Sequence, residues 1–160
     1  MRKINREVKD PNDIKEILNK CQTVRIGING PDYPYVVPVS FGFEESEEGK
    51  FVIYFHGAGI GHKHDLLERD NRVCVEADIL YGYVDLPHGS VTADYKSVIG
   101  FGIAERVDGY EEKVRGLKLL LEHCGTPGYS AEECALRAIT VVYRVTLSEI
   151  TGKQRFETEI

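Results

Sequence analysis

Residues 54–67 read Tyr-Phe-His-Gly-Ala-Gly-Ile-Gly-His-Lys-His-Asp-Leu-Leu. An apolar strand ends at His56, three glycines follow, and a helix then opens with Lys63 in its first turn. The first N–H groups of a helix lack intrahelical partners, the helix dipole adds partial positive charge, and glycine lets backbone approach a ligand closely. The pattern therefore predicts an anion site at Lys63. It fits neither the Walker A nor the dinucleotide spacing, so a plain glycine-rich connection with a solvated lysine is the alternative.

Composition limits the classes of protein to consider. A chain of 160 residues with 42% hydrophobic content is expected to form one domain over residues 1–160. A net charge of -6 argues against binding to nucleic acid. Because no run of roughly 18 apolar residues and no signal-peptide pattern is present, we expect a cytoplasmic protein without membrane contact. The four cysteines form no Cys-x-x-Cys pair and are expected to be free thiols.

Hydrophobic periodicity predicts a mainly β protein with peripheral helices. The expected helices are 11–21, 61–69, 110–123 and a short one opened by the capping box of Ser130 and Glu133, and the expected strands are 23–28, 34–43, 51–56, 72–79, 95–107 and 139–147. Residues 80–94 are expected to be an irregular loop. About six strands, mostly neighbours in sequence, indicate an antiparallel barrel rather than a parallel α/β sheet.

Two of these strands have one bulky and one nearly flat face. The bulky face of the first contains Tyr35, Val37, Val39, Phe41 and Phe43, the flat face contains Val36, Pro38, Ser40 and Gly42, and the second strand has Gly100, Gly102 and Ala104 on one face. A planar ligand or a closely packed neighbour would each explain the flat faces, and Pro38 indicates a sheet edge or a bulge. The bulky face is more than one short helix covers, so a second subunit is expected to cover it.

An ordered set of motifs resembles one known family. They are Tyr35-Val-Val-Pro-Val-Ser-Phe-Gly-Phe43, Ile53-Tyr-Phe-His56, Gly61-His-Lys63, Asn71-Arg-Val-Cys-Val-Glu76 and Tyr95-Lys-Ser-Val-Ile-Gly-Phe-Gly102. Over residues 6–153 the chain resembles the nitroimidazole resistance (Nim) proteins, which belong to the pyridoxamine 5'-phosphate oxidase-like FMN-binding split barrels. Gly57 stands where the family commonly has Ser, and His62 and His64 beside the lysine are not usual.

The resemblance implies a six-stranded antiparallel split β-barrel and a homodimer with two FMN molecules at the subunit interface. By motif position, the implied cofactor-binding residues are Pro38, Val39, Ser40, His56, Gly57, Ala58, Gly61, His62, Lys63, Gly100 and Gly102. Lys63, Gly61 and His62 would hold the phosphate, Pro38 to Ser40 would flank the isoalloxazine ring, and His56, near its reactive part, is the candidate catalytic residue. The implied activity is that of an oxidoreductase that reduces a small aromatic or nitro-substituted substrate, with the flavin carrying the electrons.

Three alternatives concern the function. The first alternative to an oxidoreductase is a non-catalytic flavin or heme binding protein, a carrier or sensor of the same fold. His56, His62 and His64 would offer imidazoles to a metal, but no carboxylate or thiolate joins them at helical spacing, so no metal is expected and His62 and His64 are read as exposed. In residues 80–95 the aromatic side chains, Tyr81, Tyr83, His88 and Tyr95, would either stack on a substrate or cap the barrel end.

Overall fold

The structure is a computed structural model that describes residues 3–126 and 128–156. Its strands are β1 (Glu7–Val8), β2 (Val24–Ile28), β3 (Tyr35–Val39), β4 (Gly42–Glu45), β5 (Phe51–Ala58), β6 (Arg72–Leu86), β7 (Ser90–Arg106) and β8 (Thr140–Arg155). Its helices are α1 (Pro11–Lys20), α2 (His62–Arg69), α3 (Tyr110–His123) and α4 (Ala131–Leu136), with single 3-10 turns η1 (Ile4–Arg6) and η2 (Pro87–Gly89). None of the helices in the described ranges is long and apolar enough to cross a membrane.

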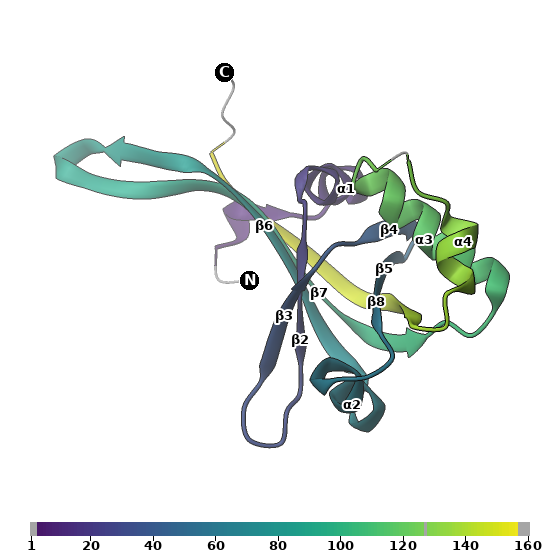
Figure 1. The fold of residues 1–160 in the computed structure, drawn as a ribbon. Helices are drawn as coiled ribbons and strands as arrows, with labels where there is room; N and C mark the ends of the chain where they lie inside the picture. The colour runs from purple at the N-terminus through teal and green to yellow at the C-terminus, as the bar shows by residue number, and fades with distance from the viewer. Residues whose placement is uncertain (1–2, 127, 157–160) are drawn as a thin grey trace.

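The strands form one antiparallel sheet in the order β3-β2-β6-β7-β8-β5-β4, and β1 pairs with β8. β3 and β4 follow one another in the chain yet lie at opposite ends of that order, so the sheet curls strongly without closing (Figure 1). The predicted fold class, a split antiparallel barrel with peripheral helices, is confirmed. The number of strands was wrong, because the described residues form eight rather than six.

The strand expected at residues 34–43 is two strands separated by Ser40 and Phe41. β3 pairs with β2 on one side only, whereas β4 pairs with β5 on the other side of the barrel. At the corner between them, Phe41 turns into the core and is fully buried. Pro38 lies in the edge strand β3, as predicted, and an edge strand is where a residue without an N–H is tolerated.

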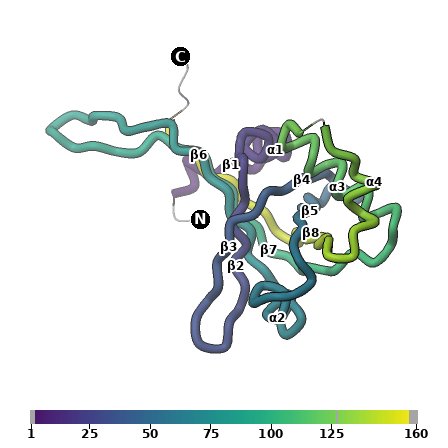
Figure 2. The backbone as a smooth tube through the Cα atoms, viewed as in Figure 1, coloured from purple at the N-terminus to yellow at the C-terminus, as the bar shows by residue number. Residues whose placement is uncertain are grey.

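Residues 80–94 are not an irregular loop. They are the outer part of the β6–β7 hairpin, which pairs from Arg72 with Ile103 to Leu86 with Ser90 and has one bulge between Leu80 and Gly82. We call residues 80–94 the arm, and it projects from the barrel body (Figure 2). Only the tip residues make the turn, where His88 and Gly89 have positive φ angles. The turn-forming residues therefore indicate the tip and the bulge of the hairpin, whereas the Tyr, Val and Thr residues between them favour strands.

Two apolar clusters hold the elements together. The larger fills the barrel and includes the buried side of α1, whose N-terminus is capped by Asp10, which accepts a hydrogen bond of 2.8 Å from the N–H of Asn12. The smaller lies between β5 and β8 on one side and α3 and α4 on the other. The capping box at α4 is confirmed on one side, because the hydroxyl of Ser130 accepts from the N–H of Glu133.

The apolar face of residues 35–43 is turned inward, which contradicts the expectation that a second subunit covers it. Its members, Tyr35, Val37, Val39, Phe41 and Phe43, lie in the barrel core or pack against it. The curling of the sheet supplies the cover, because the strands opposite β3 and β4 fill the same interior. The exposed apolar side chains are on the other face of the sheet, where Val36, Ile99, Phe101 and Ile103 lie.

Candidate functional site

The predicted strand, glycine loop and helix start are present at residues 51–69. β5 is buried up to Phe55 and emerges at His56, which lies at the surface together with Ala58. Gly61 precedes α2 with a φ of +113°, a conformation that favours glycine, and a Cβ placed there would meet nothing within 4 Å. No side chain caps this helix start. Its first N–H groups therefore have no side-chain acceptor within the described residues.

Lys63 is half-buried rather than solvated. Its Nζ lies 5.2 Å from the centre of the Phe55 ring, and a Cβ placed on Gly57 would come within 2.9 Å of it. Burial lowers the pKa of the Lys63 ammonium from its ordinary value. In the described ranges no carboxylate oxygen lies within ion-pair distance of Nζ. A partly desolvated cation without a counter-charge attracts an anion more strongly than a lysine in water does.

His56 lies close enough to Lys63 to feel its charge. Partial burial is the main cause that lowers the pKa of the His56 imidazole below 6.5, and the nearby Lys63 ammonium lowers it further. The ring is therefore neutral at pH 7. Since no side-chain hydrogen bond to His56 is formed within residues 3–126 and 128–156, both ring nitrogens remain able to contact a ligand.

The other two histidines of the motif have different surroundings. The ring of His62 is exposed and meets the ring of Tyr35 edge-on, at 4.9 Å between centroids, which places the start of α2 beside β3. His64 was expected to be exposed, and this is wrong. Its Nδ1 lies 2.6 Å from the hydroxyl of Tyr143 and its Nε2 lies 3.1 Å from a carboxylate oxygen of Glu68. No group of three or more His, Cys, Asp or Glu side chains gathers as a metal site in the part of the chain that the structure describes.

The remaining predicted site residues divide into two groups. Pro38 and Ser40 are exposed at the edge of the sheet, and Val39 between them points into the core, so its backbone alone faces outward. Gly100 and Gly102 lie on the inner side of β7, and a Cβ on them would collide with Leu147 and with the Thr146 backbone of β8. Close strand packing, the alternative interpretation, therefore explains both glycines.

Sequence reasoning missed Phe55 and Tyr143 as parts of this region. Their rings are stacked at 5.1 Å with an angle of 16° between planes, beneath Lys63 and His64. Both residues were read only as strand residues. The pairing of Phe55 with Tyr143 in the β5–β8 ladder depends on strand register, which the sequence pattern does not give.

Comparison with known proteins supports the architecture. Residues 10–154 match the family model described as pyridoxamine 5'-phosphate oxidase, while no protein of curated function matches the chain. Among solved structures, a candidate 5-nitroimidazole antibiotic resistance protein from Bacteroides thetaiotaomicron is 28% identical, with a TM-score of 0.79 over 92% of this chain and 85% of that one.

Two further structures share the fold at lower identity. The flavocytochrome Anf3 from Azotobacter vinelandii is 23% identical, with a TM-score of 0.75 over 98% of this chain and 72% of that one. The FAD and heme binding protein from Mycobacterium smegmatis is 18% identical, with a TM-score of 0.74 over 95% and 74%. With a family match over most of its length and the same barrel, the chain belongs to the pyridoxamine 5'-phosphate oxidase family, where it is similar to nitroimidazole resistance proteins.

Proposed function

We propose that this protein binds FMN and acts as an oxidoreductase on a small aromatic or nitro-substituted substrate. The observation that carries the proposal is the half-buried Lys63 ammonium, which has no carboxylate partner within the described residues and lies in the first turn of α2. A phosphate monoester supplies the missing negative charge and accepts hydrogen bonds from the free N–H groups at the helix start. The resemblance of the chain to nitroimidazole resistance proteins supports the substrate class.

The residues present fit a flavin phosphate. Gly57 leaves the space that Lys63 occupies, since a Cβ there would lie 2.9 Å from Nζ, and Gly61 keeps the helix start open. Pro38 and Ser40 offer a flat edge to the ring system, and the neutral imidazole of His56 offers one donor and one acceptor. The flavin, when bound, supplies the electron transfer, and the side chains bind and orient it.

The assembly and location are parts of the same proposal. We propose a homodimer with flavin at the subunit interface, built through the exposed apolar face of the sheet rather than through residues 35–43. A cytoplasmic location fits the four thiols, all of which are free in the structure. The non-catalytic flavin or heme carrier remains the second candidate, because two structures of the same fold are named for flavin or heme binding.

Replacement of Lys63 by Ala tests the phosphate site. We expect FMN affinity to fall roughly 10- to 100-fold, about 1.5 to 3 kcal/mol, because a charge-assisted hydrogen bond is lost. Riboflavin, which lacks the phosphate, should bind wild type and variant alike. Both dissociation constants are measured by flavin fluorescence titration, and Lys15→Ala on α1, an exposed lysine, is the matched control.

Two results would contradict the proposal. Equal losses of FMN and riboflavin affinity would mean that Lys63 acts through the fold. Stoichiometric heme binding with no flavin binding would favour the heme carrier. Catalysis is tested separately: the FMN-loaded protein is reduced with dithionite, the excess dithionite is removed under anaerobic conditions, and reoxidation of the flavin by an added nitroimidazole is followed by absorbance. One reduced flavin supplies two electrons, so reduction of the nitro group to the amine, which takes six, requires a continuous supply of an electron donor that does not react with the nitro compound itself. Flavin that binds but never transfers electrons to any nitro compound would favour the carrier.

A further inference from the structure

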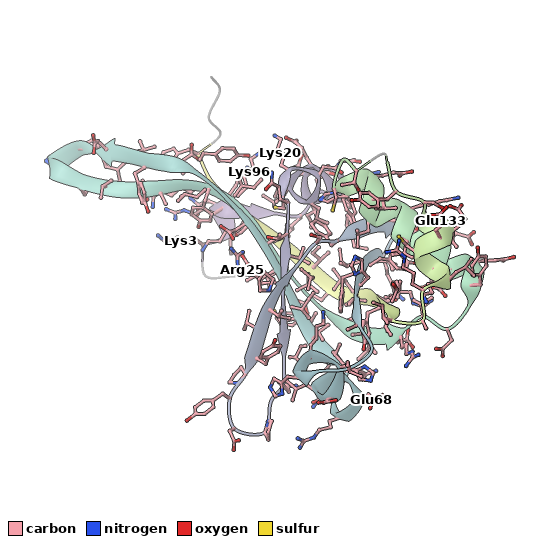
Figure 3. The ribbon with its side chains drawn as sticks, viewed as in Figure 1. Lys3, Lys20, Arg25, Glu68, Lys96 and Glu133 are labelled. Carbon is pink, nitrogen blue, oxygen red and sulfur yellow. The ribbon has the colours of Figure 1, made fainter. Side chains whose placement is uncertain are left out.

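The residue that follows Lys63 in α2 is held by two side chains at once. His64 contacts the Tyr143 hydroxyl of β8 through Nδ1, at 2.6 Å, and Glu68 one helical turn later through Nε2, at 3.1 Å. The His64 side chain is 12% exposed and that of Glu68 is 67% exposed, so the contacts run from the surface inward. Figure 3 shows Glu68 on α2, far from Glu133 on α4. The third member, Tyr143, is 3% exposed.

The Tyr143 contact is a hydrogen bond, whereas Glu68 lies at ion-pair distance. A carboxylate only accepts, so a hydrogen on Nε2 of His64 suits the contact with Glu68 and leaves Nδ1 as the acceptor. Burial raises the pKa of the Tyr143 phenol, which keeps its hydroxyl able to donate to Nδ1 of His64. Within the described residues, His64 is the only hydrogen-bond partner of that hydroxyl. Loss of the imidazole would therefore leave a buried hydroxyl without a partner, which is costly.

Tyr143, the buried member of these contacts, lies next to the ring that Lys63 contacts. The Tyr143 ring is stacked on Phe55, and Lys63 Nζ lies over the other ring of that pair. Two successive residues of α2 are thus anchored to one pair of stacked rings on β5 and β8. Leu66 and Leu67 are buried and determine which face of the helix points to the core, and the His64 contact adds a directional constraint in the N-terminal turn. A helix of eight residues is too short to hold its own geometry in water.

We propose that His64 is a positioning residue: its hydrogen bond to Tyr143 fixes the rotation of α2 and thereby aims Lys63 and the free N–H groups at the flavin phosphate. His64 touches no ligand in this role. The inference rests on the proposed phosphate site, because it assigns to His64 the orientation of that site. It predicts that removing the hydrogen bond between His64 and Tyr143 weakens binding of the FMN phosphate and leaves binding of the isoalloxazine ring unchanged.

Tyr143→Phe is the sharpest variant, because it removes only the hydroxyl and keeps the ring stacked on Phe55. We expect its dissociation constant for FMN to rise roughly 3- to 10-fold, the size of one hydrogen bond, with the riboflavin constant unchanged. His64→Leu should show the same division. The matched control is Tyr54→Phe, which removes another buried hydroxyl from β5, one bonded to Glu44, and should change neither constant.

A double variant separates positioning from general loosening. In a Lys63→Ala background, Tyr143→Phe should cost less FMN affinity than it costs in wild type, because the aimed ammonium is gone. Hydrogen exchange of the α2 amides gives a readout without flavin: Tyr143→Phe should speed exchange there, and Tyr54→Phe should not. Nitrogen NMR of His64 should show hydrogen on Nε2.

The outcomes distinguish the inference from the function on which it rests. If wild type prefers FMN over riboflavin through Lys63 but Tyr143→Phe and His64→Leu keep that preference, only the positioning role is wrong. If those variants lose FMN and riboflavin affinity equally, His64 serves the fold alone and the inference is overturned. If wild type binds FMN no better than riboflavin, the phosphate site is wrong and the inference falls with it.

Discussion

Lys63 and His56 lie close enough for the charge of one to affect the protonation of the other. Each side chain is partly desolvated, and the ammonium of Lys63 discourages protonation of His56. The fold therefore keeps one positive charge at this place and one neutral imidazole beside it. A ligand with a dianionic phosphate and a redox-active ring matches these two side chains, because the phosphate needs the positive charge of Lys63 and the ring needs only the neutral imidazole of His56.

The first prediction at this scale concerns pH and His56. Because the pKa of His56 is lowered in the folded chain, the unfolded chain takes up a proton near pH 6.5 that the folded chain refuses. The free energy of unfolding should therefore decrease as pH falls from 8 to 5, and this part of the decrease should be absent from His56→Gln. Urea unfolding of the flavin-free protein across that range measures the effect. His88→Gln at the tip of the arm is the control, and a His56→Gln profile parallel to wild type would contradict the prediction.

At the scale of elements, β7 and β8 approach one another closely at Gly102. The β7–β8 ladder shifts register between Phe101 and Gly102, and the Ser148 hydroxyl donates to the Phe101 carbonyl at the shift. A Cβ on Gly102 would lie 2.3 Å from the Thr146 carbonyl oxygen, and this oxygen belongs to backbone that cannot easily move away. A bulge at this point bends β8, which lets the same strand complete the barrel and continue to pair with β1.

Gly102→Ala should therefore harm the fold and not the flavin site. We expect a loss of roughly 1 to 3 kcal/mol in the free energy of unfolding from overpacking, or about 2 to 12 °C in melting temperature. Gly27→Ala is the matched control, because a Cβ on that strand glycine would make ordinary contacts at 3.5 Å with Cys74. Calorimetry measures the melting temperatures. Should Gly102→Ala keep its stability but lose FMN affinity, the ligand interpretation of this glycine would be reinstated.

At the scale of the whole molecule, one face of the sheet carries uncovered apolar side chains, beside the ion pairs of Arg25 with Glu76 and Asp78. Val36 of β3 and Ile99, Phe101 and Ile103 of β7 are each exposed by 41% or more, and an open groove of about 540 Å³ runs between them beside Cys74. The arm continues β6 and β7 outward from this face, and its Tyr83 side chain is 73% exposed. A contiguous apolar surface of this kind on a barrel is typical of an interface between subunits.

We expect the wild-type protein to sediment as a dimer at micromolar concentration, with an interface on the order of 2,000 Å² through this face. Phe101→Asp should give a monomer, because it buries a charge in the middle of the contact. Leu136→Asp on α4, where the side chain is 73% exposed in the single chain against 50% for Phe101, should leave the dimer intact. Flavin should favour the dimer by mass action and raise its melting temperature. A wild-type monomer that binds FMN tightly would contradict an interfacial site and leave the barrel fold unaffected.

The sequence by itself determined the local structures and the position of the lysine. Helix caps, strand periodicity and the glycine run around Gly61 depend on residues a few positions apart, so the pattern of residues 54–69 was enough to predict an anion site. The same local rules read residues 80–94 as a loop, because Gly82 and Pro87 resemble turn residues whether a hairpin continues around them or not.

Tertiary structure alone decided which face of each strand is inside and which distant residues meet. The apolar side of residues 35–43 was assigned to a partner subunit, yet the curled sheet buries it in the chain's own core. The stacking of Phe55 on Tyr143, and with it the hydrogen bond to His64, joins residues almost ninety positions apart through the register of β5 and β8. Register and curl follow from the packing of all strands together, which no single segment of the sequence contains.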